Sequence, residues 1–160
     1  MRINFHGAAH TVTGSQHLLE INGKKLLLDC GLFQGKRADT YERNLNFRHN
    51  PRDVDAVILS HAHIDHAGNL PNLVKQGYEK NIFATHATVD LASLMIRDSG
   101  RIQESDAEFV NKRRAQRGDD PIDPLYTEQD AEDAAGLFKG VEYGEAFQPI
   151  PGVIARFYEA

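Results

Sequence analysis

The stretch VDAVILSHAHIDHAG, residues 54–68, decides the fold. It opens with a near-continuous apolar run over residues 54–60, rich in β-branched side chains, which predicts a strand covered on both faces. Residues 61–66 then hold three of the eight histidines of the chain together with an aspartate. Open α/β sheets bind their ligands beyond the carboxyl ends of their strands, so this junction is the first place to expect a functional site.

Apolar patterns on both sides continue an alternation of strands and helices. HLLEI and KKLLLD are joined by Asn22-Gly23, which favours a type I′ turn, so we expect a hairpin over residues 17–29 that delivers Asp29 to a loop. The other expected elements are a strand before Gly7, a loop over 30–36, a short helix ending at Gly77, a strand at 81–85, a helix ending at Gly100, a charged helical segment at 101–117, a linker at 118–124, a helix from Thr127, and two strands within 145–160. The βαβα order predicts an α/β fold.

Composition limits the class of protein. The chain has 160 residues, 41% hydrophobic and 26% charged, and no apolar run approaches the roughly 20 residues of a membrane span. We therefore expect one soluble domain or part of a larger one. The N-terminus has no signal-peptide pattern, and the single Cys30 cannot form an internal disulfide, so we expect a cytoplasmic protein.

Charge leaves two interpretations of one cluster. A net charge of −5 argues against nucleic-acid binding through bulk electrostatics. The basic residues that could still contact phosphate are Arg101, Lys112, Arg113, Arg114 and Arg117. They are flanked by acids, so they form either a solvated helix face with i,i+4 pairs or a phosphate-contact surface.

The histidine cluster has the composition of a metal site. Residues two apart point to opposite sides of a helix but to the same side of an extended segment, so His61 and His63 can share an ion only on a loop. Imidazole and carboxylate donors without cysteine suit zinc, manganese or iron at a catalytic site. Because sequence neighbours diverge, two ions fit better than one, with His61 and His63 on the first ion and Asp65 and His66 on the second.

Chance is a poor explanation for this cluster. At this histidine and aspartate content, H-x-H-x-D-H is expected about 0.002 times in such a chain. Asp29 ends a buried strand, where an unpaired carboxylate is costly, so we expect it to orient a ligand or backbone amides, with a plain turn carboxylate as the alternative. We interpret Cys30 as a core thiol and Ser60 as a turn hydroxyl. The isolated histidines, expected to be surface or hydrogen-bonded residues, are His6, His10, His17, His49 and His86.

These motifs resemble those of a known family. SHAHIDHAG (60–68) resembles the H-x-H-x-D-H signature of the metallo-β-lactamase superfamily. Residues 7–35, GAAHTVTGSQHLLEINGKKLLLDCGLFQG, resemble the opening of its β-CASP branch, the RNA-processing group that contains RNase J and the cleavage-and-polyadenylation endonuclease subunit. The likeness continues through FATHATVDL (83–91), IQESDAEFVNKR (102–113) and PLYTEQDA (124–131).

The resemblance implies an αββα sandwich, two zinc ions, with manganese as an alternative metal, and hydrolysis of RNA phosphodiester bonds. By motif, His61, His63, Asp65 and His66 match the family's metal ligands, and Asp29 matches its first conserved acid. Asp29 and Asp65 are the candidate catalytic residues, because the family's equivalent of Asp65 also helps to position the attacking water.

In one respect the sequence departs from that family. A Gly-His segment, a bridging aspartate, the β-CASP insert and a final histidine are expected after residue 160, and residues 87–160 contain no histidine. We therefore expect residues 1–160 to be the N-terminal part of a metallo-β-lactamase-fold domain. The missing ligands should come from the rest of a full-length protein, and the isolated chain should bind zinc weakly and have little or no activity, since catalytic zinc takes three protein ligands.

The sequence leaves other functions open. The chain could belong to another hydrolase of the superfamily that acts on a thioester or a lactam. It could instead be a non-catalytic fragment that binds metal, RNA or a partner, and a homodimer is also possible. Exonuclease and endonuclease activities are not distinguished by any motif.

Overall fold

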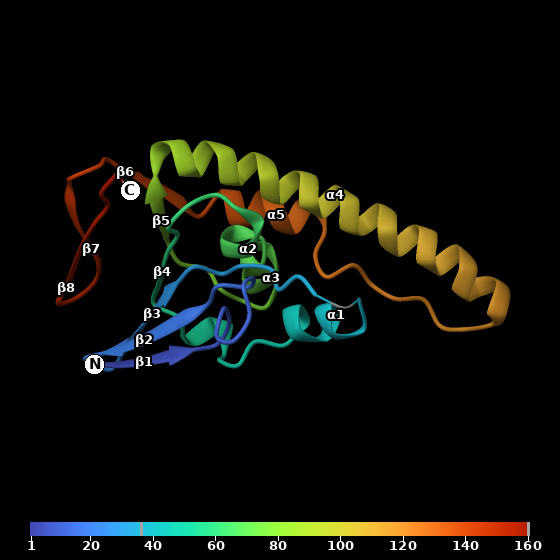
Figure 1. Ribbon diagram of the computed structural model, residues 1–160. Coiled ribbons are helices and arrows are strands. Elements are labelled where there is room, and N and C mark those ends of the chain that lie inside the picture. The colour runs from blue at the N-terminus through green and yellow to red at the C-terminus, as the bar shows by residue number, and fades with distance from the viewer. Residues whose placement is uncertain (36, 160) are drawn as a thin grey trace.

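The computed structural model describes residues 1–35 and 37–159, and its central layer is a sheet in the order β1-β2-β3-β4-β5-β6 (Figure 1). The strands are β1 (Arg2–Phe5), β2 (His17–Ile21), β3 (Lys24–Leu28), β4 (Ala56–Ile58), β5 (Ile82–Thr85) and β6 (Phe138–Val141). Strands β1 to β3 are antiparallel, and β3 to β6 run parallel. The predicted α/β class is therefore confirmed. Residues 36 and 160, which fall in the predicted loop and in the predicted last strand, lie outside the described residues.

The hairpin β2–β3 forms as predicted. Its turn residues Asn22 and Gly23 have φ angles of 51° and 76°, the positive values that a type I′ turn requires. The central strand is shorter than the predicted 54–60, but both of its faces are covered. Leu27 and Val57 are fully buried on the helical side of the sheet, while Leu26 and Ala56 face the opposite layer.

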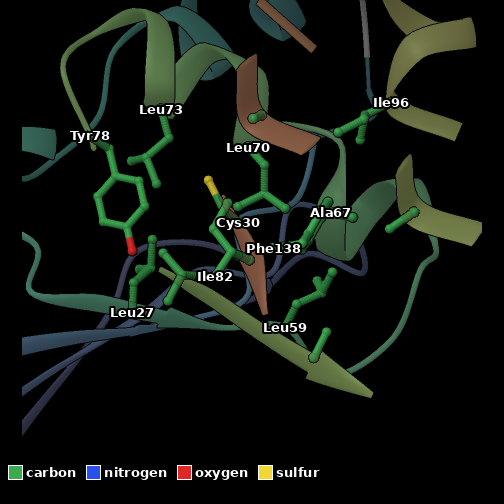
Figure 2. Close-up of a cluster of buried hydrophobic side chains, with 14 of the residues drawn as sticks. Leu27, Cys30, Leu59, Ala67, Leu70, Leu73, Tyr78, Ile82, Ile96 and Phe138 are labelled. Carbon is green, nitrogen blue, oxygen red and sulfur yellow. The ribbon is translucent and has the colours of Figure 1, made fainter. Parts of the chain in front are cut away.

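Helices cover one face of the sheet (Figure 1). They are α2 (Ile64–Ala67), α3 (Leu70–Lys75), α4 (His86–Arg117) and α5 (Glu128–Ala135), with α1 (Arg37–Leu45) and the 3-10 turn η1 (Pro51–Asp53) between β3 and β4. Figure 2 shows the core between sheet and helices, where Leu27, Leu59 and Ile82 meet Leu70 and Ile96. The Cys30 side chain lies among these apolar groups and is fully buried, so its interpretation as a core thiol is confirmed.

A second β layer packs on the other face. Strands β7 (Ala146–Ile150) and β8 (Val153–Arg156) form an antiparallel pair, as predicted for the last part of the chain. Ile150 packs with Leu26 and Ala56 of the central sheet. Helices, sheet and hairpin thus give three of the four layers of the expected αββα sandwich.

One predicted boundary is wrong. The helix expected to end at Gly100 and the charged segment after it form a single helix, α4, of 32 residues. Gly100 is buried at a helix crossing, where a Cβ atom would come within 2.9 Å of Thr127 O and of Glu128 N. Gly100 therefore allows close packing of α4 against the start of α5 and does not end the helix.

The start of α5 is confirmed, whereas a helix, a 3-10 turn and a strand were missed. The Thr127 side chain accepts a hydrogen bond from the Asp130 backbone, and the Asp130 side chain accepts one from the Thr127 backbone, which completes a capping box. Helix α1, the turn η1 and strand β6 were not predicted. Of the helices in the described part of the chain, none combines the length and apolar character that crossing a membrane requires.

Candidate metal centre

The candidate site is built around Asp29, the residue that follows β3. Its φ of 58° turns the chain sharply out of the sheet, and its side chain is buried. One carboxylate oxygen accepts hydrogen bonds from Ser15 Oγ at 3.2 Å, from Ser60 Oγ at 3.0 Å and from His66 Nδ1 at 2.8 Å. The other oxygen accepts from the backbone N–H of Ser60 at 2.8 Å. Four donors converge on this carboxylate, so its expected role of orienting other groups is well supported.

The bond to Asp29 fixes how His66 presents its ring. A carboxylate only accepts, so the proton of the imidazole must be on Nδ1. The lone pair of Nε2 is then free to bind a metal ion, and Nε2 lies 3.7 Å from the Asp65 carboxylate. A hydrogen bond of this kind, from a ligand histidine to a carboxylate behind it, is the usual way in which proteins orient metal ligands.

The three histidines of the cluster lie together. The ring centroids of His61 and His63 are 4.8 Å apart, and those of His61 and His66 are 4.0 Å apart. Partial burial, followed by the neighbouring His66 and His63, lowers the pKa of His61 below its ordinary value of 6.5. A lowered pKa favours the neutral imidazole, which is the form that binds metal.

Backbone contacts hold the cluster in place. Cys30 N donates to His66 O at 2.8 Å, and Ser15 N donates to Asp65 O at 2.9 Å. A Cβ atom on Gly31 would overlap the carbonyl of Asp65, so the loop after β3 can approach α2 this closely only with glycine. The loop after β3 therefore packs directly on the segment that carries Asp65 and His66.

The prediction that the whole cluster is a loop is wrong in part. His61 and His63 do lie on an extended segment after β4, but Asp65 and His66 belong to the short helix α2. Four residues do not form a stable helix alone. Helix α2 forms because the loop after β3 supplies backbone partners at both ends, such as Leu32 N to Ile64 O and Asn69 N to Cys30 O.

The imidazole and carboxylate donors of the cluster are of the types that bind a divalent metal ion. Nε2 of His66 and the Asp65 carboxylate are 3.7 Å apart, close to the separation of two donors that each lie about 2.0–2.2 Å from one ion. The ring of His61 lies near both His63 and His66, at centroid distances of 4.8 Å and 4.0 Å, so the predicted division of the ligands between two ions stays a prediction. Among the described residues, no three His, Cys, Asp or Glu side chains converge closely enough to hold an ion, so the cluster provides pairs of ligands rather than a closed site.

A separate cavity of about 790 Å³ lies between α1, the C-terminal half of α4 and residues 119–125. Arg113, Arg114 and Arg117 of the predicted basic cluster line it together with apolar side chains. Arg113 stacks on Phe109 with its guanidinium 4.4 Å from the ring centroid, and Arg101 pairs with Glu128 of α5. Arg113 and Arg101 thus use a ring contact and an ion pair to another helix rather than i,i+4 ion pairs, and the alternative of a phosphate-contact surface stays a prediction.

Sequence reasoning missed the partners of Asp29. Ser15 and Ser60 were not assigned to the site, because they lie 14 and 31 residues from Asp29 and carry no motif of their own. His6 and His49 are hydrogen-bonded, one of the two expectations for the isolated histidines, but their pairing with each other, with Nδ1 atoms 3.1 Å apart, was not predicted. The pairing of β3 with β2 and β4 brings Ser15 and Ser60 to Asp29.

A histidine and carboxylate cluster at the end of a buried parallel strand, under a layer of helices, is typical of an α/β domain that binds metal. The chain belongs to the metallo-β-lactamase superfamily, whose sequence profile matches residues 11–158. Membership in this superfamily implies that the domain binds divalent metal.

Relatives of this chain include named ribonucleases. It is 39% identical over 145 residues to ribonuclease TTHA0252 of Thermus thermophilus, covering 91% of this chain and 29% of that protein. It is 28% identical over 141 residues to endoribonuclease YSH1 of Gibberella zeae, with 86% and 15% covered, and 35% identical over 101 residues to Integrator complex subunit 11 of Danio rerio, with 60% and 17% covered. The chain thus spans less than a third of the length of these relatives.

Among solved structures, a metallo-β-lactamase of Cronobacter sakazakii with a HARLDQ motif matches at a TM-score of 0.49 and 18% identity, covering 95% of this chain and 44% of that one.

Proposed function

We propose that this chain forms the N-terminal part of the active site of a metal-dependent ribonuclease of the β-CASP type, working in the cytoplasm on RNA. The observation that carries the proposal is the Asp29 carboxylate, which holds His66 by its Nδ1 while His61, His63 and Asp65 surround the same strand end. The named ribonucleases among the relatives support RNA as the substrate.

The metal ligands in this proposal are His61, His63, Asp65 and His66, with zinc as the metal and manganese as its substitute. When bound, such ions activate water and polarise a phosphoryl group, so no protein nucleophile is needed. Asp29 orients His66 and Ser60 through the hydrogen bonds described above. Asp65 lies in the cluster itself, with a quarter of its side chain exposed. Asp65 is therefore the carboxylate placed to act on the attacking water.

The four ligands supply about two donors to each of two ions, whereas a catalytic zinc ion takes three protein ligands and water. In our proposal the remaining donors come from a longer protein, in keeping with the length of the relatives. The 160-residue chain should then bind zinc weakly and hydrolyse RNA slowly or not at all.

Two measurements test this function. Isothermal titration of the purified chain with zinc should give weak binding, which His63→Ala and Asp65→Ala reduce further and which a His10→Ala control leaves unchanged. Labelled single-stranded RNA, a thioester and a lactam are then offered to the longest protein encoded by the same reading frame, with Asp65→Asn as the inactive control. RNA cleavage that needs Asp65 supports the proposal. Turnover of the thioester or lactam instead, or RNA cleavage by the Asp65→Asn variant, overturns it. If the 160-residue chain alone holds two ions tightly and hydrolyses RNA fast, the proposal that its active site is incomplete is wrong.

A further inference from the structure

The hydroxyl of Ser60 lies between two groups of the candidate metal centre. Ser60 Oγ is 3.0 Å from a carboxylate oxygen of Asp29 and 2.9 Å from Nδ1 of His61. The backbone N–H of Ser60 donates to the other oxygen of Asp29 at 2.8 Å, so two bonds to one carboxylate fix the position of this residue. Ser60 is the last residue before the cluster, and the hydroxyl joins the buried acid to its first histidine.

The direction of these bonds follows from counting protons. A hydroxyl carries one proton and can also accept, whereas an ionised carboxylate can only accept. If the Ser60 proton pointed to His61, two acceptor oxygens would face each other at 3.0 Å, at a cost comparable to a lost hydrogen bond. Ser60 therefore donates to Asp29, and its oxygen accepts from the N–H of His61.

That direction determines the tautomer of His61. The proton lies on Nδ1, and the lone pair of Nε2 is left for a ligand. We propose that Ser60 is a positioning residue: by donating to Asp29 and accepting from His61, a relay of hydrogen bonds, it selects Nε2 of His61 as the metal-binding atom. The inference rests on the proposed function for the identity of the ligand, but the tautomer itself exists without metal.

One buried carboxylate thus orders two of the three histidines. Asp29 acts on His66 directly and on His61 through Ser60, and both imidazoles are protonated on Nδ1. The described residues give His63, whose side chain is exposed, no comparable hydrogen bond. His63 is consequently an internal control, because its tautomer should not respond to changes at Ser60.

The test uses the metal-free chain first. Nitrogen-15 NMR correlations distinguish Nδ1–H from Nε2–H imidazoles in mildly alkaline buffer, where histidines are uncharged. We expect Nδ1–H for His61 in the unmodified chain and a shift toward Nε2–H in Ser60→Ala. Ser60→Thr, which keeps the hydroxyl, should restore Nδ1–H, and His63 should stay the same in all three. A His61 that is Nε2–H in the unmodified chain overturns the proposal without need of any variant.

Zinc affinity is the second measurement. Removing a group that orients a ligand typically lowers metal affinity about 10–100-fold, so Ser60→Ala should bind zinc that much more weakly and Ser60→Thr close to normally. An unchanged tautomer and affinity in a folded Ser60→Ala, or loss of both in a folded Ser60→Thr, refutes the relay. If the tautomers follow the expectation while the full protein does not hydrolyse RNA, the proposed function fails and the relay stands.

Discussion

Substitutions of Asp29 distinguish the effect of its carboxylate hydrogen bonds from the effect of its left-handed backbone conformation. Its φ of 58° lies in the left-handed region, which Asp and Asn tolerate better than other side chains. Asp29→Asn therefore keeps the backbone preference and the volume. It cannot keep the hydrogen bonds, because one oxygen accepts from Ser60 N–H and the other accepts from Ser15, Ser60 and His66. Whichever way the amide turns, its NH₂ group faces at least one donor.

The magnitude follows from those contacts. A fully buried donor left without an acceptor costs about 1–3 kcal/mol, and most donors to Asp29 are only partly buried, so Asp29→Asn should lower the free energy of unfolding by about 1 kcal/mol. Asp29→Ala removes all four bonds and adds roughly 1–2 kcal/mol of left-handed backbone strain, so its loss should be clearly larger. Asp29→Ala frees the His66 ring, so its zinc affinity should fall about 10–100-fold, whereas Asp29→Asn replaces a charged acceptor of His66 with a neutral amide and should lower the affinity less.

Urea unfolding followed by circular dichroism gives the stabilities, and calorimetric titration with zinc gives the affinities. Asn22→Ala is the matched control, because Asn22 also has a positive φ, of 51°, but lies exposed in the hairpin turn. It should lose about 1 kcal/mol of stability from strain and none of the zinc affinity. An Asp29→Asn variant with normal stability and normal zinc affinity would refute the reasoning, as would an Asn22→Ala variant with equally weakened zinc binding.

Three further predictions concern stability. Burial lowers the pKa of His49 from 6.5 to about 4, so the folded state favours the neutral imidazole. The contribution of His49 to the free energy of unfolding is therefore complete above pH 6.5 and is lost as the pH falls toward 4. After allowing for partial exposure, this contribution is on the order of 2 kcal/mol. Unfolding measured across this range should show a shallower pH dependence in His49→Gln, and identical profiles contradict the assignment. Gly100→Ala should destabilise the chain by about 1–3 kcal/mol in thermal unfolding, because its Cβ meets the Thr127 carbonyl; a gain in stability, usual for this change in a helix, contradicts the packing. Thr127→Ala should cost about 1 kcal/mol through loss of the capping box, and a neutral result contradicts that role.

Much of the fold could be predicted because its signals are local. The Asn22-Gly23 turn and the apolar run before the histidines each define an element from a few neighbouring residues, and both elements form. Gly100 misled the prediction because its reason is not local. Glycine after an apolar helical pattern is typical of a helix end, but here it allows α5 to approach α4.

The same distinction applies to the candidate site. The cluster from His61 to His66 is visible in the sequence, since its donors are close neighbours and the strand before them is apolar. Their orientation is not visible, because it depends on the contact of His66 with Asp29, 37 residues away in the chain. That contact exists because β3 and β4 are parallel neighbours, with Leu28 opposite Ile58, so that the residues following them reach the same edge of the sheet.

The two candidate catalytic aspartates differ in what already surrounds them. The Asp29 side chain is 10% exposed and accepts four hydrogen bonds, so binding a metal ion directly would require it to abandon several donors, of which Ser15 is buried. The Asp65 side chain is 25% exposed, and its recorded side-chain neighbour is His66 at 3.7 Å. Binding a metal there breaks no comparable set of bonds. In our proposal the two aspartates therefore have separate roles, with Asp29 orienting the metal ligands and Asp65 serving as the carboxylate ligand that also contacts water.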